Sequence, residues 1–131
     1  MIFIAQKTKD GDKVAIKEIA QGIDSPVHFI AKILQDLSRK GLLQSSKGPN
    51  GGFYLDHISM KRSLADIVRA VDGERLFKGC GLGLPQCSES HPCPIHHQFK
   101  TVRMQLMQTF ETAKVGDLGD ALDNSGTFLK R

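Results

Sequence analysis

Residues 25–55, SPVHFIAKILQDLSRKGLLQSSKGPNGGFYL, place a helix, a strand, a turn and a second strand in close succession. Ser25 is typical of a helix N-cap, and Pro26 suits the first helical position because no amide hydrogen is needed there. Gly41 favours the C-terminal end of this helix. Apolar residues recur between them at the spacing of one buried helix face, at Ile30, Ile33, Leu34 and Leu37. We therefore predict an amphipathic helix followed by two short strands.

The turn and the flanking segments extend this pattern into a fold. GPNGG at residues 48–52 is turn-forming, because Pro sets one φ angle and Asn-Gly tolerates positive φ. Helices are also predicted over residues 1–9 and 14–22, and Ser63 with Asp66 has the capping-box pattern of another. The order of these elements predicts a mainly α fold with a small β-wing, a winged helix-turn-helix domain over residues 1–75.

A further long helix is predicted from Pro94 to about Val115. Apolar residues step along it by three and four positions, at Phe99, Val102, Leu106, Phe110 and Ala113. This stripe packs either on the chain's own core or on a second subunit. A winged domain of this size has little core left to offer, so we favour a dimerisation helix. With a short terminal helix it forms a segment over 94–123, and residues 124–131 are expected to fray.

The composition limits the class of protein. The chain has 131 residues, a net charge of +4 and a pI near 9.1, which permit a polyanionic partner without proving one. It has neither a long apolar run nor a signal peptide, so we expect a cytoplasmic protein that does not enter the membrane. We find no glycine-rich phosphate loop and no carboxylate pair placed for acid–base work. An enzyme with a small-molecule substrate is therefore not expected.

All three cysteines lie in CGLGLPQCSESHPC, residues 80–93, within a predicted loop over 76–93. An odd number argues against a closed disulfide framework, and clustered thiols in a reducing compartment are more often metal ligands or redox-active groups. An enzyme nucleophile is usually one activated cysteine in a packed pocket, not three on a Gly- and Pro-rich loop. The gaps between the cysteines suit a structural zinc poorly, because such sites favour closer pairs.

The predicted fold also indicates which residues would contact DNA. A helix-turn-helix places its second helix in the major groove, where His28 and Lys32 would face the bases; Gln35 more simply belongs to a solvated face. In the wing, a lysine precedes glycines that let the backbone approach the minor groove or a phosphate. The predicted DNA-binding residues are Ser25, Pro26, His28, Lys32, Lys47, Gly48, Asn50 and Gly51. The alternative to a DNA-binding role is a winged domain that has lost DNA binding and acts as a protein–protein adaptor.

The stretch at 25–55, SLADIVRAVDG at 63–73 and the three spaced cysteines together resemble the IscR/NsrR family of bacterial winged-helix regulators. The resemblance runs from Met1 to about Leu122. It implies a homodimeric transcription factor on a palindromic operator, with an iron–sulfur cluster that senses redox state, nitric oxide or iron–sulfur status. Cluster binding between the two elements that flank the loop would change the distance between the DNA-binding domains of the two subunits.

The resemblance also implies the ligands of the cluster. Cys80, Cys87 and Cys93 would each supply a thiolate, and His96, three residues after Cys93, would be the fourth ligand. His91 and His97 are alternatives. A 2Fe–2S cluster is favoured and a 4Fe–4S cluster is possible, and either can be absent from aerobically purified protein.

The chain departs from the family pattern in two respects. Family members usually begin further upstream, and in NsrR-like members an acidic residue of that segment, from the partner subunit, completes the cluster. The gap between Cys80 and Cys87 is one residue longer than is usual. The alternative function is therefore a cluster-free transcriptional repressor that senses thiol oxidation or binds zinc.

Overall fold

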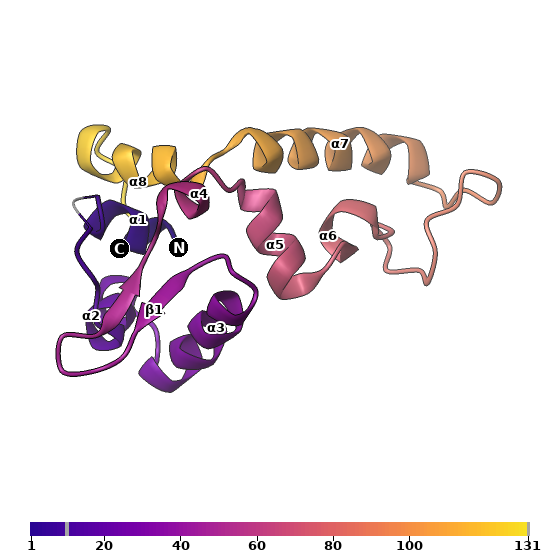
Figure 1. Ribbon diagram of the computed structural model, residues 1–131. Helices are drawn as coiled ribbons and strands as arrows, with labels where there is room; N and C mark the ends of the chain where they lie inside the picture. Colours follow the sequence, from indigo (N-terminus) through magenta and orange to yellow (C-terminus); the bar gives the residue numbers. More distant parts are fainter. Residues whose placement is uncertain (10, 131) are drawn as a thin grey trace. The chain divides into compact units, whose positions relative to one another are not determined.

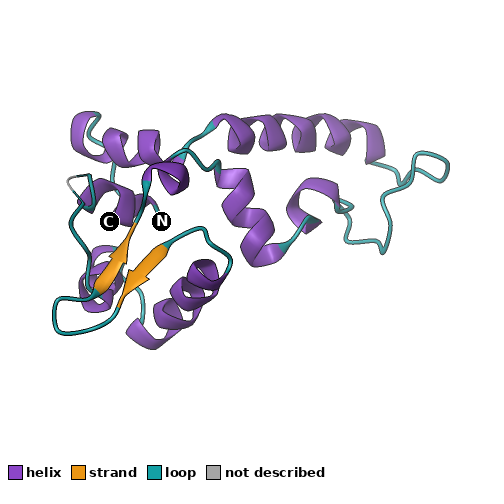
Figure 2. Ribbon diagram, in the orientation of Figure 1, coloured by secondary structure: helices purple, strands orange, loops and turns teal. Residues whose placement is uncertain are grey.

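The computed structural model describes residues 1–9 and 11–130, and confirms a mainly α fold with a two-stranded antiparallel wing (Figures 1 and 2). Two compact units are formed, one from residues 1–9, 11–62 and 113–130 and the other from Ser63–Thr112. The expected DNA-binding segment 1–75 thus contributes to both units. The elements in chain order are α1 (Ile2–Lys7), α2 (Ile16–Gly22), α3 (Val27–Arg39), β1 (Gln44–Ser46), β2 (Gly52–Tyr54), α4 (His57–Met60), α5 (Leu64–Asp72), α6 (Arg75–Lys78), α7 (His96–Thr112) and α8 (Val115–Asn124).

The first unit is built around the apolar side of α3. Ile30, Leu34 and Leu37 are buried there, as the three- and four-residue spacing predicts. The start of this helix differs from the prediction: Pro26 is the N-cap, α3 begins at Val27, and the Ser25 side chain makes no capping bond. The Ser25 amide instead donates to the carbonyl of Ala20, which closes the turn between α2 and α3.

The wing follows directly from α3. Ser45 of β1 pairs with Phe53 of β2, and Phe53 also exchanges two backbone hydrogen bonds with Val14. Gly48 has a φ of +105°, a region that glycine enters without strain. A Cβ on Gly51 would lie 2.3 Å from the Ser46 carbonyl oxygen, so only glycine fits this close turn.

The terminal helix α8 returns to the first unit and lies against α1 (Figure 1). Its Gly119 is buried, and a Cβ there would meet the Ala5 Cβ at 2.9 Å, so the two helices approach with backbone nearly in contact. Lys9 Nζ bridges Asp120 and Asp123 at 2.7 Å each. The expected frayed tail runs from 124 to 131; Asn124 is the last residue of α8, and residue 131 lies outside the described residues.

The second unit contains α5, α6, the cysteine loop and α7. The capping box of Ser63 and Asp66 is present as predicted, with both reciprocal hydrogen bonds formed. Buried Phe77 of α6 packs edge-on against Phe110 of α7, with ring centroids 6.1 Å apart. Part of the α7 stripe therefore packs within its own unit, whereas Val102 on the same helix is 56% exposed. No helix in the described part of the chain is long and apolar enough to cross a bilayer.

Candidate functional site

The polar side of α3 is a candidate nucleic-acid surface in the first unit. His28 and Lys32 are both exposed and lie one helical turn apart, as the sequence predicted. Pro26 is exposed at the helix start, and Ser25 is half-buried. Sequence reasoning missed Phe29, a residue that is 57% exposed beside these polar groups. The signal available in the sequence was an aromatic residue that lies next to, but outside, the apolar stripe of this helix.

The wing and the C-terminal half of α3 enclose a groove of about 710 Å³. Lys47, Gly48 and Gly51 of the predicted set line it, together with Arg39. Asn50, at the tip of the same turn, lies on a separate hollow with Lys13 and Gly51. The Lys13 Nζ also donates to Ser46 Oγ at 3.1 Å. The structure therefore gathers three cations around the wing, two of which, Lys13 and Arg39, sequence reasoning did not single out.

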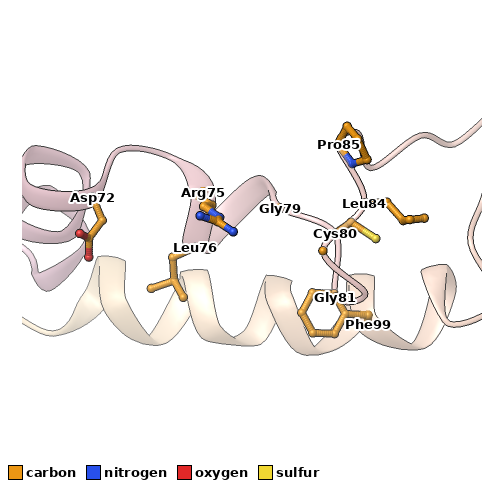
Figure 3. A pocket seen from close by; sticks show the side chains of 10 residues that line it. Asp72, Arg75, Leu76, Gly79, Cys80, Gly81, Leu84, Pro85 and Phe99 are labelled. Carbon is orange, nitrogen blue, oxygen red and sulfur yellow. The ribbon is translucent and has the colours of Figure 1, made fainter.

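The cysteine loop in the second unit is anchored at both ends. Cys80 follows α6 and lines a cavity of about 780 Å³ with Arg75, Leu84 and Phe99 (Figure 3). The Phe99 ring of α7 lies so close to Gly81 that a Cβ there would meet it at 2.7 Å. Backbone amides of Leu82 and Leu84 hold the pKa of the Cys80 thiol below its ordinary value. Such an environment favours a thiolate, the form that binds metal or attacks an oxidant.

The four predicted ligands form two pairs. Cys80 Sγ lies 3.8 Å from Cys93 Sγ, and Cys87 Sγ lies 3.5 Å from His96 Nδ1. All three thiols are free. At a tetrahedral ion with metal–sulfur bonds of about 2.3 Å, two thiolates stand about 3.8 Å apart and a thiolate and an imidazole about 3.5 Å. Each separation is therefore that of two ligands of one metal ion.

His96 is the most enclosed member of this set. Its side chain is almost fully buried, and its backbone amide donates to the Cys93 carbonyl at 2.9 Å. With Nδ1 toward Cys87, Nε2 points to a carboxylate oxygen of Glu89 at 3.6 Å and forms no hydrogen bond in the described part of the chain. The alternatives are exposed: His91 contacts Ser90, and the ring of His97 stacks edge-on against that of His96.

Two further residues approach these side chains and were missed from the sequence. Glu89 binds Lys100, which holds the pKa of the Glu89 carboxyl below its usual range. Arg103 Nη1 donates to Cys87 Sγ at 3.3 Å. Both are charged residues, which from sequence alone are expected on the solvated surface. Their contacts with the cysteine loop are therefore visible only in the folded structure. No group of three or more His, Cys, Asp or Glu side chains in the described ranges is arranged to hold a single metal ion.

A winged helix-turn-helix with an exposed, partly basic reading helix defines a class of DNA-binding transcriptional regulators. The chain matches the model of the Rrf2 family, described as iron-dependent transcriptional regulators, over residues 1–121. The protein belongs to the Rrf2 family. The resemblance to IscR- and NsrR-type regulators is thereby confirmed, and a family of regulators agrees with the expectation that the protein is not an enzyme.

Individual relatives agree with this family. The chain is 33% identical over 121 residues to a protein of Aquifex aeolicus named as an HTH-type transcriptional regulator, covering 90% of this chain and 84% of that protein. It is 27% identical to the HTH-type transcriptional repressor NsrR of Streptomyces coelicolor, over 66% of this chain and 55% of the relative.

Solved structures share the fold. CymR, the global cysteine regulator of B. subtilis, superposes with a TM-score of 0.70 at 21% identity, covering 91% of this chain and 86% of that one. IscR of T. potens superposes with a TM-score of 0.69 at 17% identity, covering 95% and 82%. At these identities the superpositions show the fold alone.

Proposed function

We propose that the protein is a homodimeric transcriptional regulator whose affinity for a palindromic operator depends on an iron–sulfur cluster. Cys80, Cys87, Cys93 and His96 would hold the cluster. The observation that carries this proposal is the arrangement of these side chains in two pairs, at 3.8 and 3.5 Å. The description of the family as iron-dependent, and relatives named NsrR and IscR, support it.

The paired arrangement favours a 2Fe–2S cluster, in which each iron takes two protein ligands. The cluster would supply a redox- and nitric-oxide-sensitive group, and imidazole ligation makes such a centre more labile than four thiolates. Two contacts support this role for His96: its backbone hydrogen bond to Cys93 and the approach of Glu89 to Nε2. A carboxylate on the outer nitrogen is the usual way in which a ligand histidine is oriented.

The DNA-reading surface of the first unit would act through three kinds of contact. His28 and Lys32 present hydrogen-bond donors on α3, and Phe29 beside them can pack on a thymine methyl group. Lys47, with Arg39 across the groove, would neutralise phosphates beside the wing. Val102, exposed on α7, belongs to the surface that would meet a second subunit.

The test is to purify and reconstitute the protein without oxygen, and then assay iron, acid-labile sulfide and operator affinity. We expect two irons and two sulfides per subunit, as the two ligand pairs imply, with absorption lost in Cys87→Ser and in His96→Ala. His91→Ala is the matched control and should retain the cluster. Equal operator affinity of cluster-loaded and cluster-free protein would overturn the sensing function, and a colourless, metal-free protein would overturn the cluster.

A thiol switch is the second candidate, favoured by the 3.8 Å separation of Cys80 and Cys93. The two thiols would lose two electrons and two protons to hydrogen peroxide, which becomes two waters, and a disulfide would form between the sulfurs. The solved structures that share this fold include an oxidised form of CymR from Staphylococcus aureus. Peroxide treatment of metal-free protein should then link Cys80 to Cys93 and leave Cys87 as a thiol. Operator affinity should change when this disulfide forms and should not change without it.

A further inference from the structure

We infer that Arg103 is a positioning residue for the cluster, one that donates a hydrogen bond to the sulfur of Cys87 and raises the reduction potential of the bound centre. This inference rests on the proposed function and deepens it. Arg103 lies on α7 seven residues after His96, two helical turns along the same side of the helix. Its position beside the ligands therefore follows from helical spacing once His96 faces the loop.

The contacts of Arg103 are specific. One guanidinium nitrogen, Nη1, lies 2.7 Å from the Gly79 carbonyl oxygen and 3.3 Å from Cys87 Sγ. The guanidinium carbon is 5.9 Å from the centroid of the Phe99 ring, itself packed on Gly81. Because Gly79 directly precedes Cys80, one side chain joins the backbone before the first cysteine to the sulfur of the second.

The consequence for a cluster follows from charge. A cation that donates to a thiolate ligand withdraws electron density from the sulfur and stabilises the more negative, reduced state of the centre. Both contacts are made by Nη1, whose two N–H bonds point in fixed directions in the guanidinium plane, whereas lysine presents one compact charge. The same bond fixes the orientation of Cys87, as partners beyond the first ligands commonly do.

A purely structural role makes a different prediction. If Arg103 only ties the loop to α7 through Gly79, its loss would lower thermal stability and leave the electronic properties of the centre unchanged. A role toward Cys87 would change the potential and the iron–thiolate stretching frequencies in the resonance Raman spectrum. Those two readouts separate the roles, because neither responds to a loop that is merely less stable.

The experiment uses the full chain, reconstituted anaerobically, with Arg103→Met, Arg103→Gln and Arg103→Lys. Lys78→Met removes the same charge from an exposed side chain of the same unit and is the matched control. We expect Arg103→Met to shift the potential to more negative values, to change the Raman frequencies and to lose iron to a chelator roughly tenfold faster. Arg103→Lys should restore part of the potential, and Lys78→Met should behave as wild type.

Two results would decide against the inference. Wild-type potential and Raman frequencies in Arg103→Met would overturn it while leaving the cluster, and so the proposed function, in place. If that variant fails to fold by circular dichroism, Arg103→Gln, which keeps a neutral donor, decides in the same way. A wild-type protein that takes up no cluster would overturn the proposed function first, and this inference with it.

Discussion

Replacing Lys47 by Gln should weaken the salt dependence of operator binding by a predictable amount. Lys47 is exposed beside the wing groove, and in the described ranges of the chain it makes no ion pair, so its charge is available to a phosphate. Each phosphate that a cation neutralises contributes about 0.9 to the slope of log K against log salt. A dimer with one such contact per subunit would therefore lose about 1.8 from the slope.

The assay is fluorescence anisotropy of a labelled operator, identified beforehand by binding selection, titrated at several salt concentrations. Between about 50 and 200 mM salt, a slope difference of about 1.8 makes the wild-type protein lose about twelvefold more affinity than Lys47→Gln. Lys61→Gln is the control, because Lys61 lies by α4, on a cavity with α1 and α8 and not on the wing. An unchanged slope in Lys47→Gln, or an equal change in Lys61→Gln, would refute the assignment of the wing to phosphate binding.

Three further predictions test the reading helix and the scaffold. If Phe29 packs on a thymine methyl, replacing one thymine in each half-site by deoxyuridine should lower the affinity of the wild-type dimer about fifteenfold, from about 0.8 kcal/mol for each of the two buried methyl groups. The same replacement should leave the affinity of Phe29→Ala unchanged, and equal losses in the two proteins would refute the contact. Gly119→Ala should lower the free energy of unfolding by about 1–3 kcal/mol in urea denaturation, because the new methyl meets Ala5 at 2.9 Å, although the same change in an open helix gains stability. Asp56 accepts a hydrogen bond from the Ser59 amide at 2.7 Å, and this bond lowers the pKa of the Asp56 carboxyl. The ionised carboxylate therefore stabilises the folded protein above the pKa of the unfolded state, and this stabilisation is lost as the pH falls through the pKa of the folded state. Asp56→Asn should accordingly flatten the acid limb of the free energy of unfolding plotted against pH.

Local patterns were sufficient to predict the reading helix and the wing. The apolar spacing of Ile30, Leu34 and Leu37 is a property of one helix, and Gly48 allows a turn that few other residues adopt. The start of α3 was misplaced because Ser25 and Pro26 each satisfy a capping rule, and only the backbone bond of Ser25 to Ala20 decides which residue begins the helix.

Short or distant interactions were not predictable in this way. The helices α4 and α6 have four residues each, too few for any periodic signal. The return of α8 to α1 depends on contacts between residues more than a hundred positions apart, such as Lys9 with Asp123. Nothing near Lys9 in the chain indicates such a partner.

The same division applies to the candidate site. The amino-acid sequence by itself determined the class of protein, because helix spacing, turn chemistry and the run of three cysteines are local features that survive without a fold. Only the tertiary structure decided that Cys80 pairs with Cys93 while Cys87 pairs with His96, and that Arg103 reaches Cys87. The physical reason is that the loop has no repeat of its own. Its path is set by where α6 ends, where α7 begins and how closely Phe99 packs on Gly81.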